Sequence, residues 1–282
     1  MFKQIMIAKE MIKNNFIRNV NNGNYHSMDF LYKNLYNNPK YLNSKRITHY
    51  GKSAFSQNGE DGLIQEIFNR ISTTNKYFVE FGVENGLECN TTFLLLNDWK
   101  GLWIEADKKS CSEIQENFKE VIKKEHLKVK NSFITPENIE EIFDEFEIPK
   151  SPDVLSIDID STDYWVRKAI KKYTPRVLIM EYNDTYFPPT VWIQKKDKAT
   201  WEKGINYGAS LQALHDLNKN MGYTLIGCDF NGVNAFFLRN DCYSEELFEK
   251  NTSAEYHYEN QKQLSFYYSH KKTSFDLGQK DI

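Results

Sequence analysis

The stretch Tyr77-Phe-Val-Glu-Phe-Gly-Val-Glu-Asn-Gly-Leu-Glu88, followed by Gly101-Leu-Trp-Ile-Glu-Ala-Asp107, decides the fold of this chain. Two short apolar runs end in small or acidic residues, and a helix-like stretch over 90–98 separates them. Such a strand–loop–helix–strand unit predicts two parallel strands, with a ligand crevice at the carboxyl end of the first. Gly82 and Gly86 let the backbone of this loop turn tightly and approach a ligand closely.

The polar residues of this unit indicate what the crevice binds. Glu105, at the tip of the second strand, is placed to accept hydrogen bonds from the two hydroxyls of a ribose. The loop carries carboxylates at Glu80, Glu84 and Glu88, which suit a pyrophosphate poorly and a positively charged nucleoside well. S-adenosylmethionine is the common cellular ligand of that kind.

Composition and charge narrow the class of protein. The chain has 282 residues, 40% of them hydrophobic and 15% aromatic, which is enough for one large domain with a sizeable core. The formal net charge of −3 argues against a nucleic-acid partner bound through its phosphates. No apolar run reaches the roughly 18 residues of a membrane span. The first residues do not form a secretory signal, and the cysteines lack metal-ligand spacing, so we expect a cytoplasmic protein.

Hydrophobic periodicity divides the chain into three predicted parts. Residues 1–50 carry apolar side chains at near-helical spacing, which predicts an N-terminal helical extension that serves as a lid, a packing element or a homodimer contact. Residues 51–245 alternate strands and helices, which predicts an α/β domain with a mostly parallel sheet and an antiparallel closing hairpin. Residues 246–282 form a tail that we expect to pack on this domain.

The predicted elements of the central domain alternate regularly. Strands are expected at 77–81, 102–105, 127–133, 153–158, 176–181, 223–228 and 234–239. Helices are expected at 60–70, 90–98, 108–123, 137–146, 163–172 and 210–221. Pro136 is expected in the first turn of the helix over 137–146, where a missing amide costs nothing.

Polar residues end several successive strands, where the ligands of such sheets bind. They are Glu80 and Gly82, Glu105, Asn131 and Ser132, Asp158 and Asp160, and Glu181 and Asn183. Of the doublet Asp158 and Asp160, one carboxylate can bind a divalent cation while the other takes a proton from a substrate hydroxyl. Alternatively, one of them hydrogen-bonds the amine of a cofactor. Asp163 is expected to cap the helix that follows.

An aromatic insertion, Tyr186-Phe-Pro-Pro-Thr-Val-Trp192, follows the fifth strand. It is either a wall that stacks on a sugar or a packed surface loop. His215 falls within an amphipathic helix pattern and is expected to be structural or exposed. The chain contains no GxSxG motif and no phosphate-binding P-loop.

In these residues the chain resembles the class I S-adenosylmethionine-dependent methyltransferases, and among them the FkbM-like group. The matching segments, over about residues 55–239, are Phe55-Ser-Gln-Asn-Gly-Glu-Asp-Gly62, Phe78-Val-Glu-Phe-Gly-Val-Glu-Asn-Gly86, Gly101-Leu-Trp-Ile-Glu105, Asp153-Val-Leu-Ser-Ile-Asp-Ile-Asp160, Ile179-Met-Glu-Tyr-Asn183, Gly208-Ala-Ser-Leu-Gln-Ala-Leu214 and Gly232-Val-Asn-Ala-Phe-Phe237. The resemblance implies a doubly wound, mostly parallel seven-stranded sheet, the Rossmann-like methyltransferase fold. It also implies methyl transfer to oxygen, commonly on sugars of surface polysaccharides or secondary metabolites.

The resemblance further implies roles for single residues. Cofactor contacts fall on Gln57, Glu80, Gly82, Asn85, Gly86, Glu105, Ser132, Phe133 and Asp158. Among these, the two glycines face the methionine part, Glu105 holds the ribose, and Ser132 with Phe133 borders the adenine. The segment Ser56-Gln57 closes over the cofactor.

Catalytic roles are implied for Asp160, as the base, and for Asp158 and Glu181. A site for Mg²⁺ or Mn²⁺ would use Asp158, Glu181 and Asn183, although Tyr182 stands where such relatives carry a second acid.

We therefore predict an O-methyltransferase that acts on a small-molecule or carrier-linked sugar, such as a nucleotide-linked sugar or a capsular polysaccharide precursor. One alternative is an NAD-dependent nucleotide-sugar enzyme, but Gly82-Val-Glu-Asn-Gly86 lacks the middle glycine of the GxGxxG turn. The other is a non-catalytic ligand-binding module on the same fold. The acid pair at Asp158 and Asp160 argues against that module.

Overall fold

The computed structural model describes residues 37–197 and 205–261. The chain forms two compact units, residues 1–44 and 45–282. In the first, the short 3-10 helix η1 (Pro39–Tyr41) follows Asn38, whose side chain accepts a hydrogen bond from the Lys40 amide. The apolar positions of the predicted N-terminal helix lie outside the described residues, so the division at 50 and 245 stays a prediction.

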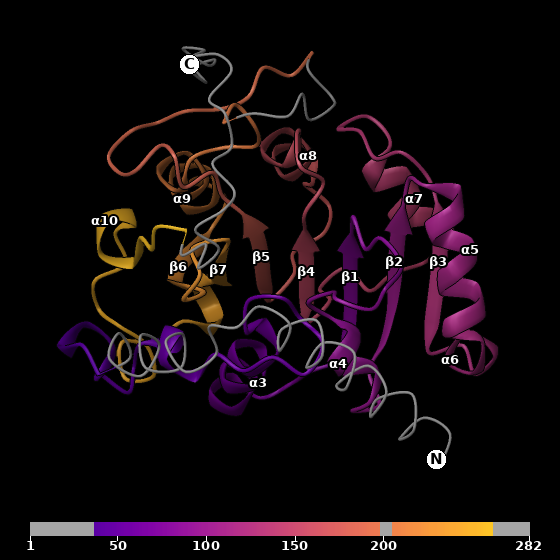
Figure 1. Cartoon of the computed structure of the whole chain (residues 1–282), viewed down its shortest axis with the longest axis horizontal. Helices are drawn as coiled ribbons and strands as arrows, with labels where there is room; N and C mark the ends of the chain where they lie inside the picture. Colours follow the sequence, from indigo (N-terminus) through magenta and orange to yellow (C-terminus); the bar gives the residue numbers. More distant parts are fainter. Residues whose placement is uncertain (1–36, 198–204, 262–282) are drawn as a thin grey trace, which may run out of the picture. The chain divides into compact units, whose positions relative to one another are not determined.

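A seven-stranded sheet forms the centre of the second unit, in the order β3-β2-β1-β4-β5-β7-β6. Its strands are β1 (Tyr77–Phe81), β2 (Lys100–Glu105), β3 (Leu127–Asn131), β4 (Val154–Ile157), β5 (Val177–Glu181), β6 (Tyr223–Cys228) and β7 (Asn234–Arg239). Strands β1 to β5 are parallel, and the arrows of β1, β4 and β5 point the same way in Figure 1. Strand β7 runs antiparallel between β5 and β6. The predicted fold class and the antiparallel closing hairpin are confirmed.

Helices cover both faces of this sheet. The second unit contains η2 (Ile47–Tyr50), α3 (Glu60–Ile71), α4 (Thr92–Leu95), α5 (Lys108–Asn117), α6 (Lys119–Lys123), α7 (Ile139–Glu145), α8 (Asp163–Ala169), α9 (Leu211–Asn220), η3 (Asn240–Cys242) and α10 (Ala254–His257). Along β1, Phe78 joins the core with α3, α4 and α5, whereas Val79 joins the core with α7, α8 and α9. Strands buried on both faces explain the nearly continuous apolar runs of the sequence. In the described part of the chain, we find no helix with the length and apolar character needed to cross a bilayer.

Several predicted helices differ from the observed ones: the helix expected over 90–98 spans only Thr92–Leu95, and two further differences have a visible cause. The helix expected over 108–123 is divided at Phe118, which leaves the helical conformation and packs edge-on against Trp103, with ring centroids 4.9 Å apart. The helix expected to hold Pro136 in its first turn begins only at Ile139, because the Asn138 side chain accepts the Thr135 amide and closes a turn before it. Both differences come from side-chain contacts that a periodicity pattern does not contain.

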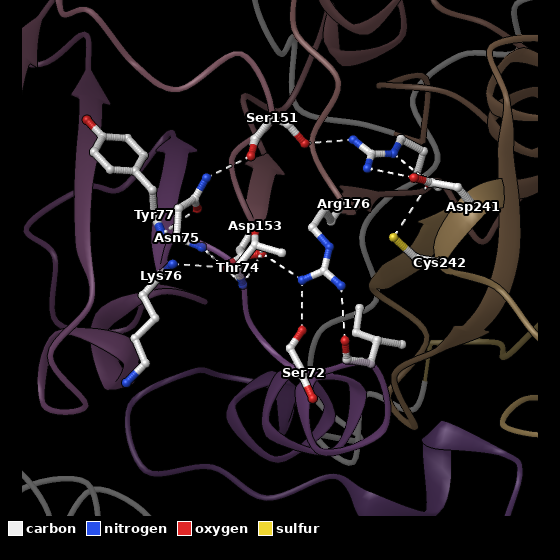
Figure 2. Close-up of polar contacts among 12 residues, drawn as sticks. Ser72, Thr74, Asn75, Lys76, Tyr77, Ser151, Asp153, Arg176, Asp241 and Cys242 are labelled. Atoms are coloured by element: carbon white, nitrogen blue, oxygen red, sulfur yellow. Dashed lines mark hydrogen bonds and ion pairs between the residues drawn. The ribbon is translucent and has the colours of Figure 1, made fainter.

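A buried ion pair joins the amino ends of β1, β4 and β5 (Figure 2). Asp153 accepts hydrogen bonds from the amides of Thr74 and Lys76 and from Arg176, the last at 2.9 Å. Arg176 also donates to the Ser72 carbonyl at 2.7 Å, at the end of α3. This network fixes the α3–β1 turn at the amino ends of the strands, whereas the ligands of such sheets bind at the carboxyl ends.

Candidate functional site

The carboxyl ends of β1, β2, β4 and β5 border a cavity of about 420 Å³. This volume lies within the roughly 300–1,000 Å³ of small-molecule and cofactor sites. The predicted site residues that line it are Gln57, Glu80, Gly82, Asn85, Glu105, Ser132, Phe133, Asp158, Asp160 and Glu181. The structure therefore brings together residues from six separate segments, while Gly86 and Asn183 are not among the lining residues.

Glu105 presents a fixed carboxylate to this cavity. Its Oε2 accepts the Glu84 amide at 2.8 Å, and its Oε1 accepts the Asp107 amide at 2.7 Å. Each oxygen keeps a further lone pair, so the carboxylate can accept two more hydrogen bonds in a fixed geometry. Glu84 adopts a left-handed backbone conformation (φ 46°), which turns its amide toward Glu105. This arrangement suits the predicted contact with the two hydroxyls of a ribose.

The two glycines of the first loop are required for different reasons. Gly82 has a φ of 68°, and a Cβ on it would lie 1.7 Å from the Asp158 carbonyl oxygen, so the loops after β1 and β4 cross closely here. Gly86 has a φ of 79°, and a Cβ on it would lie 2.6 Å from the Trp103 ring and 2.9 Å from Phe118. Packing against these rings therefore explains Gly86, whose predicted contact with the cofactor stays a prediction.

Glu80 lines the cavity, but its carboxylate mainly holds the segment before α4. It accepts the amides of Asn90 and Thr91, each at 3.0 Å, and the Thr91 hydroxyl. Burial raises the pKa of Glu80 to about 7, although these hydrogen bonds lower it. The Trp103 indole donates to the same Thr91 hydroxyl at 2.8 Å. Glu80 thus shapes the crevice wall through contacts within the protein.

The segment before α3 is fixed beside the cavity by Asp61. One oxygen of its carboxylate accepts the amides of Ala54 and Phe55, both at 2.7 Å, and of Ser56 at 3.0 Å. Gln57, next in the chain, donates to Glu88 of the β1 loop at 3.1 Å. This bond joins two loops that both line the cavity, and the closing role of Ser56-Gln57 stays a prediction.

Three carboxylates meet at the ends of β4 and β5. Asp158, Asp160 and Glu181 each place one oxygen within 4.8 Å of the other two. Burial raises the pKa of all three carboxyl groups, and the neighbouring carboxylates raise those of Asp158 and Glu181 further. Carboxylates this close resist simultaneous ionisation, so the group takes up protons more readily than separate acids do.

Asp163 positions this group. It was expected to cap α8, but its carboxylate instead accepts the amides of Ile159 at 2.9 Å and Ser161 at 3.0 Å. Burial raises the pKa of Asp163 to about 6. The loop folded around Asp163 holds Asp160 in a left-handed conformation, with a φ of 57°. The backbone that carries the acid pair is therefore fixed by a third acid.

Glu60 and Asn234 are among the lining residues that were not predicted from the sequence. Asn234, at the start of β7, lies opposite Glu181 of β5, and its Nδ2 donates to Glu60 at 2.8 Å. The turn before it is held by Asp229, which accepts the amides of Asn231, Val233 and Asn234 and whose pKa burial raises to about 8. Glu60 and Asn234 lie in segments that carry the family resemblance, and this was the available signal.

Asn183 uses its carboxamide within the insertion that follows β5. Its Nδ2 donates to the carbonyls of Ile205 and Tyr207 at 2.7 and 2.9 Å, and its Oδ1 accepts the Thr185 amide at 3.0 Å. The oxygen predicted to bind a metal therefore serves this loop. The third possible metal ligand beside Asp158 and Glu181 is therefore Asp160 and not Asn183.

The aromatic insertion is largely packed on itself. Tyr186 and Trp192 are buried and stack with ring centroids 4.5 Å apart, so neither ring is free to stack on a sugar. Phe187, in contrast, is 64% exposed. His215 lies on α9 and contacts Asp216 at 2.9 Å, in keeping with the expected structural or exposed role.

No family model and no curated protein matches this chain. Solved structures are similar in fold. One is an S-adenosylmethionine-dependent methyltransferase from Clostridium acetobutylicum ATCC 824, at 11% identity and TM-score 0.41 over 65% of this chain and 92% of that chain. Another is the N-terminal domain of EvdMO1 with SAH bound, at 10% identity and TM-score 0.41 over 65% and 80%. The cyclase SpnF is similar at 9% identity and TM-score 0.39 over 64% and 66%. These low values describe a likeness of fold alone.

Proposed function

We propose that this protein is an S-adenosylmethionine-dependent O-methyltransferase of the FkbM-like group. Its acceptor is a hydroxyl of a sugar, either nucleotide-linked or in a surface or capsular polysaccharide precursor. The fixed carboxylate of Glu105 carries this proposal, because it offers two acceptor oxygens at the tip of β2 to the hydroxyls of a ribose. The proposal includes a cytoplasmic location. It also includes a homodimer, which a measurement of molar mass by light scattering tests.

The charge of the cavity fits a sulfonium nucleoside. Its ionisable lining residues, apart from Cys89, are the acids Glu60, Glu80, Glu84, Glu88, Glu105, Asp158, Asp160 and Glu181. Among the described lining residues there is no lysine, arginine or histidine. Such a field favours a positively charged ligand and disfavours the pyrophosphate of NAD. The exposed ring of Phe133, beside Ser132, offers a flat apolar surface of the kind that an adenine needs.

The acid group supplies the chemistry that methyl transfer requires from the protein. When bound, S-adenosylmethionine supplies an electrophilic methyl group: the acceptor oxygen forms the new bond to carbon as the sulfur–carbon bond breaks, and that electron pair stays on sulfur. The residues must align the acceptor and remove its hydroxyl proton. We assign the removal of this proton to Asp160. Burial raises the pKa of Asp160, which brings it closer to the working pH than the pKa of an ordinary aspartate. Asp158 and Glu181 hold the acceptor beside it.

A divalent cation is a separate part of the proposal. Asp158, Asp160 and Glu181 offer hard oxygen ligands that suit Mg²⁺ or Mn²⁺ and do not suit zinc. Activity after exhaustive chelation decides this point. Loss of turnover that Mg²⁺ restores assigns the three acids to a metal, and full turnover without added cation assigns them to the acceptor.

Calorimetry tests the cofactor. We expect S-adenosylmethionine and its demethylated product to bind, and Glu105→Ala to weaken both by about tenfold or more, as the loss of charge-assisted hydrogen bonds predicts. Glu113→Ala is the matched control, since Glu113 lies on the surface of α5 and its ion pair among the described residues is with Lys109. Tight binding of NAD without binding of S-adenosylmethionine would overturn the proposed function.

A further inference from the structure

Asn234 leaves a hydrogen-bond acceptor unused in the wall of the cavity. The residue is only 3% exposed, and its buried Oδ1 has no partner among the described residues. The orientation of the amide is fixed by Glu60, whose carboxylate accepts from Nδ2 and from the Asn58 amide. Because buried polar atoms are almost always paired, this oxygen indicates a ligand that donates a hydrogen bond.

The three carboxylates that line the cavity together with Asn234 also lack partners in the described part of the chain. Asp158, Asp160 and Glu181 line the same cavity, and no hydrogen bond from another described residue ends on their side-chain oxygens. This wall therefore consists of acceptors and carries negative charge. A hydroxyl-rich ligand satisfies such a wall, whereas a phosphate brings further acceptors and further negative charge to it.

We propose that the acceptor enters this cavity as an unphosphorylated polyhydroxyl compound, whose hydroxyls donate to Oδ1 of Asn234 and to the three carboxylates. The inference rests on the proposed function and chooses between the classes of acceptor that it names. A polysaccharide unit or glycoside without a neighbouring phosphate fits, and a nucleotide-linked sugar, with its diphosphate at the ring, does not. The described lining holds no basic side chain that would neutralise the phosphate.

Matched pairs of acceptors test this specificity. The methyl glycosides of glucose, galactose and mannose are compared with the corresponding sugar 1-phosphates and nucleotide sugars, by methyl-transfer rate and by calorimetry on the protein saturated with S-adenosylhomocysteine. We expect the unphosphorylated member of the preferred pair to have a kcat/KM at least about tenfold higher. A preference for the phosphorylated member, or no preference in any pair, overturns the inference. Failure of S-adenosylhomocysteine to bind would instead overturn the proposed function.

Two variants test which residues of the cavity wall cause the preference for unphosphorylated acceptors. Glu181→Gln removes one negative charge from the wall and should narrow the preference for the unphosphorylated acceptor, while Glu113→Gln, on the surface of α5, should leave it unchanged. Asn234→Ser should raise KM for the acceptor at least about fivefold and leave the affinity for S-adenosylhomocysteine unchanged. Unchanged acceptor KM in Asn234→Ser would contradict the role given to its oxygen. The comparison of acceptors in the wild-type protein stands even if a variant does not fold.

Discussion

Asp160 joins a strained backbone to a side chain that lines the cavity. Its left-handed conformation is one that aspartate and asparagine tolerate better than most residues. We therefore expect Asp160→Asn to keep its melting temperature within a few degrees, while kcat falls by about a hundredfold because the proton acceptor is lost. Rate measurements with the preferred acceptor and thermal denaturation check this together.

Asp98 provides the control for Asp160. It has a similar left-handed conformation, with a φ of 60°, and lies in the exposed turn after α4. Asp98→Asn should change neither the melting temperature nor kcat. Full activity in Asp160→Asn would remove that residue from the mechanism.

Glu181 is expected to lower the stability of the fold at neutral pH. Burial and the neighbouring carboxylates raise its pKa in the folded state, so the folded protein binds a proton more tightly than the unfolded chain does. Stability contributed by such a group is complete below the unfolded pKa of about 4.3 and is lost as pH rises toward the folded pKa. Glu181→Gln should thus melt at a higher temperature than wild type at pH 8.

The pH dependence of that difference is the decisive measurement. The gain in melting temperature should shrink as pH falls toward 5, because wild-type Glu181 becomes protonated and then resembles glutamine. Activity should fall in the same variant, in the manner of a site that trades stability for function. An unchanged melting temperature at pH 8 would mean that ionised Glu181 does not lower the stability of the fold.

At the scale of elements, Ser210 connects α9 to the insertion that follows β5. Its hydroxyl accepts the Ala213 amide in the first turn of α9, accepts the Trp192 amide at 3.0 Å, and donates to the Thr190 carbonyl at 2.8 Å. Ser210→Ala should lower the free energy of unfolding by about 1–2 kcal/mol, because a helix cap and a buried hydrogen bond are lost together. Chemical denaturation measures this change.

Ser253 is the matched control for Ser210. It caps α10 by accepting the Tyr256 amide, and in the described part of the chain its side chain makes no hydrogen bond to another element. Ser253→Ala should therefore cost less than Ser210→Ala. Equal costs would show that the link between Ser210 and the insertion adds nothing.

The elements that the sequence predicted best are those with the strongest apolar patterns. Strands β1, β6 and β7 have the predicted bounds, because their apolar runs and flanking turns specify them locally. The break at Phe118 was missed, since its cause is a contact with Trp103 on another element. The Glu60–Asn234 pair was missed for a similar reason: 174 positions separate the two residues, and only the sheet order brings them together.

The acid pair illustrates the same limit within the site. Its place at the end of β4 followed from the strand pattern, and its union with Glu181 at the end of β5 followed from neighbouring parallel strands. The role of Asp163 did not follow, because a first-turn acid resembles a cap in any sequence. Only the fold of the loop shows that its bonds go backward to Ile159 and Ser161.

At the scale of the whole molecule, Asp153 and Arg176 tie the starts of three strands together (Figure 2). Asp153→Ala should lower the free energy of unfolding by about 3–5 kcal/mol, because it leaves a buried guanidinium uncompensated. The exposed pair of Lys130 and Glu145 is the control, and Glu145→Ala should cost about 0–1 kcal/mol. Equal losses in the two variants would contradict a special role for the buried pair.

The same ion pair sets a lower pH limit on stability. Burial raises the pKa of Asp153, but hydrogen bonds from Arg176 and Thr74 outweigh it, and the net pKa is lowered. The stability it contributes is therefore present above the unfolded pKa of about 3.9 and is lost as pH falls through the folded value. The difference between wild type and Asp153→Ala should accordingly be full at pH 6 and decline below pH 4.

Strand β7 is the last described strand to be synthesised, yet it lies between β5 and β6 in the sheet. Until residues 234–239 have left the ribosome, β5 keeps an unpaired row of backbone groups along Val177–Glu181, the kind of edge to which other chains add. A nascent chain that stalls before this point is therefore prone to aggregation although most of its sheet is made. Its cavity is incomplete as well, because Asn234 meets Glu60 and Glu181 only when β7 enters. Translation of a single late strand thus covers the open edge of β5 and completes the wall of the cavity at the same time.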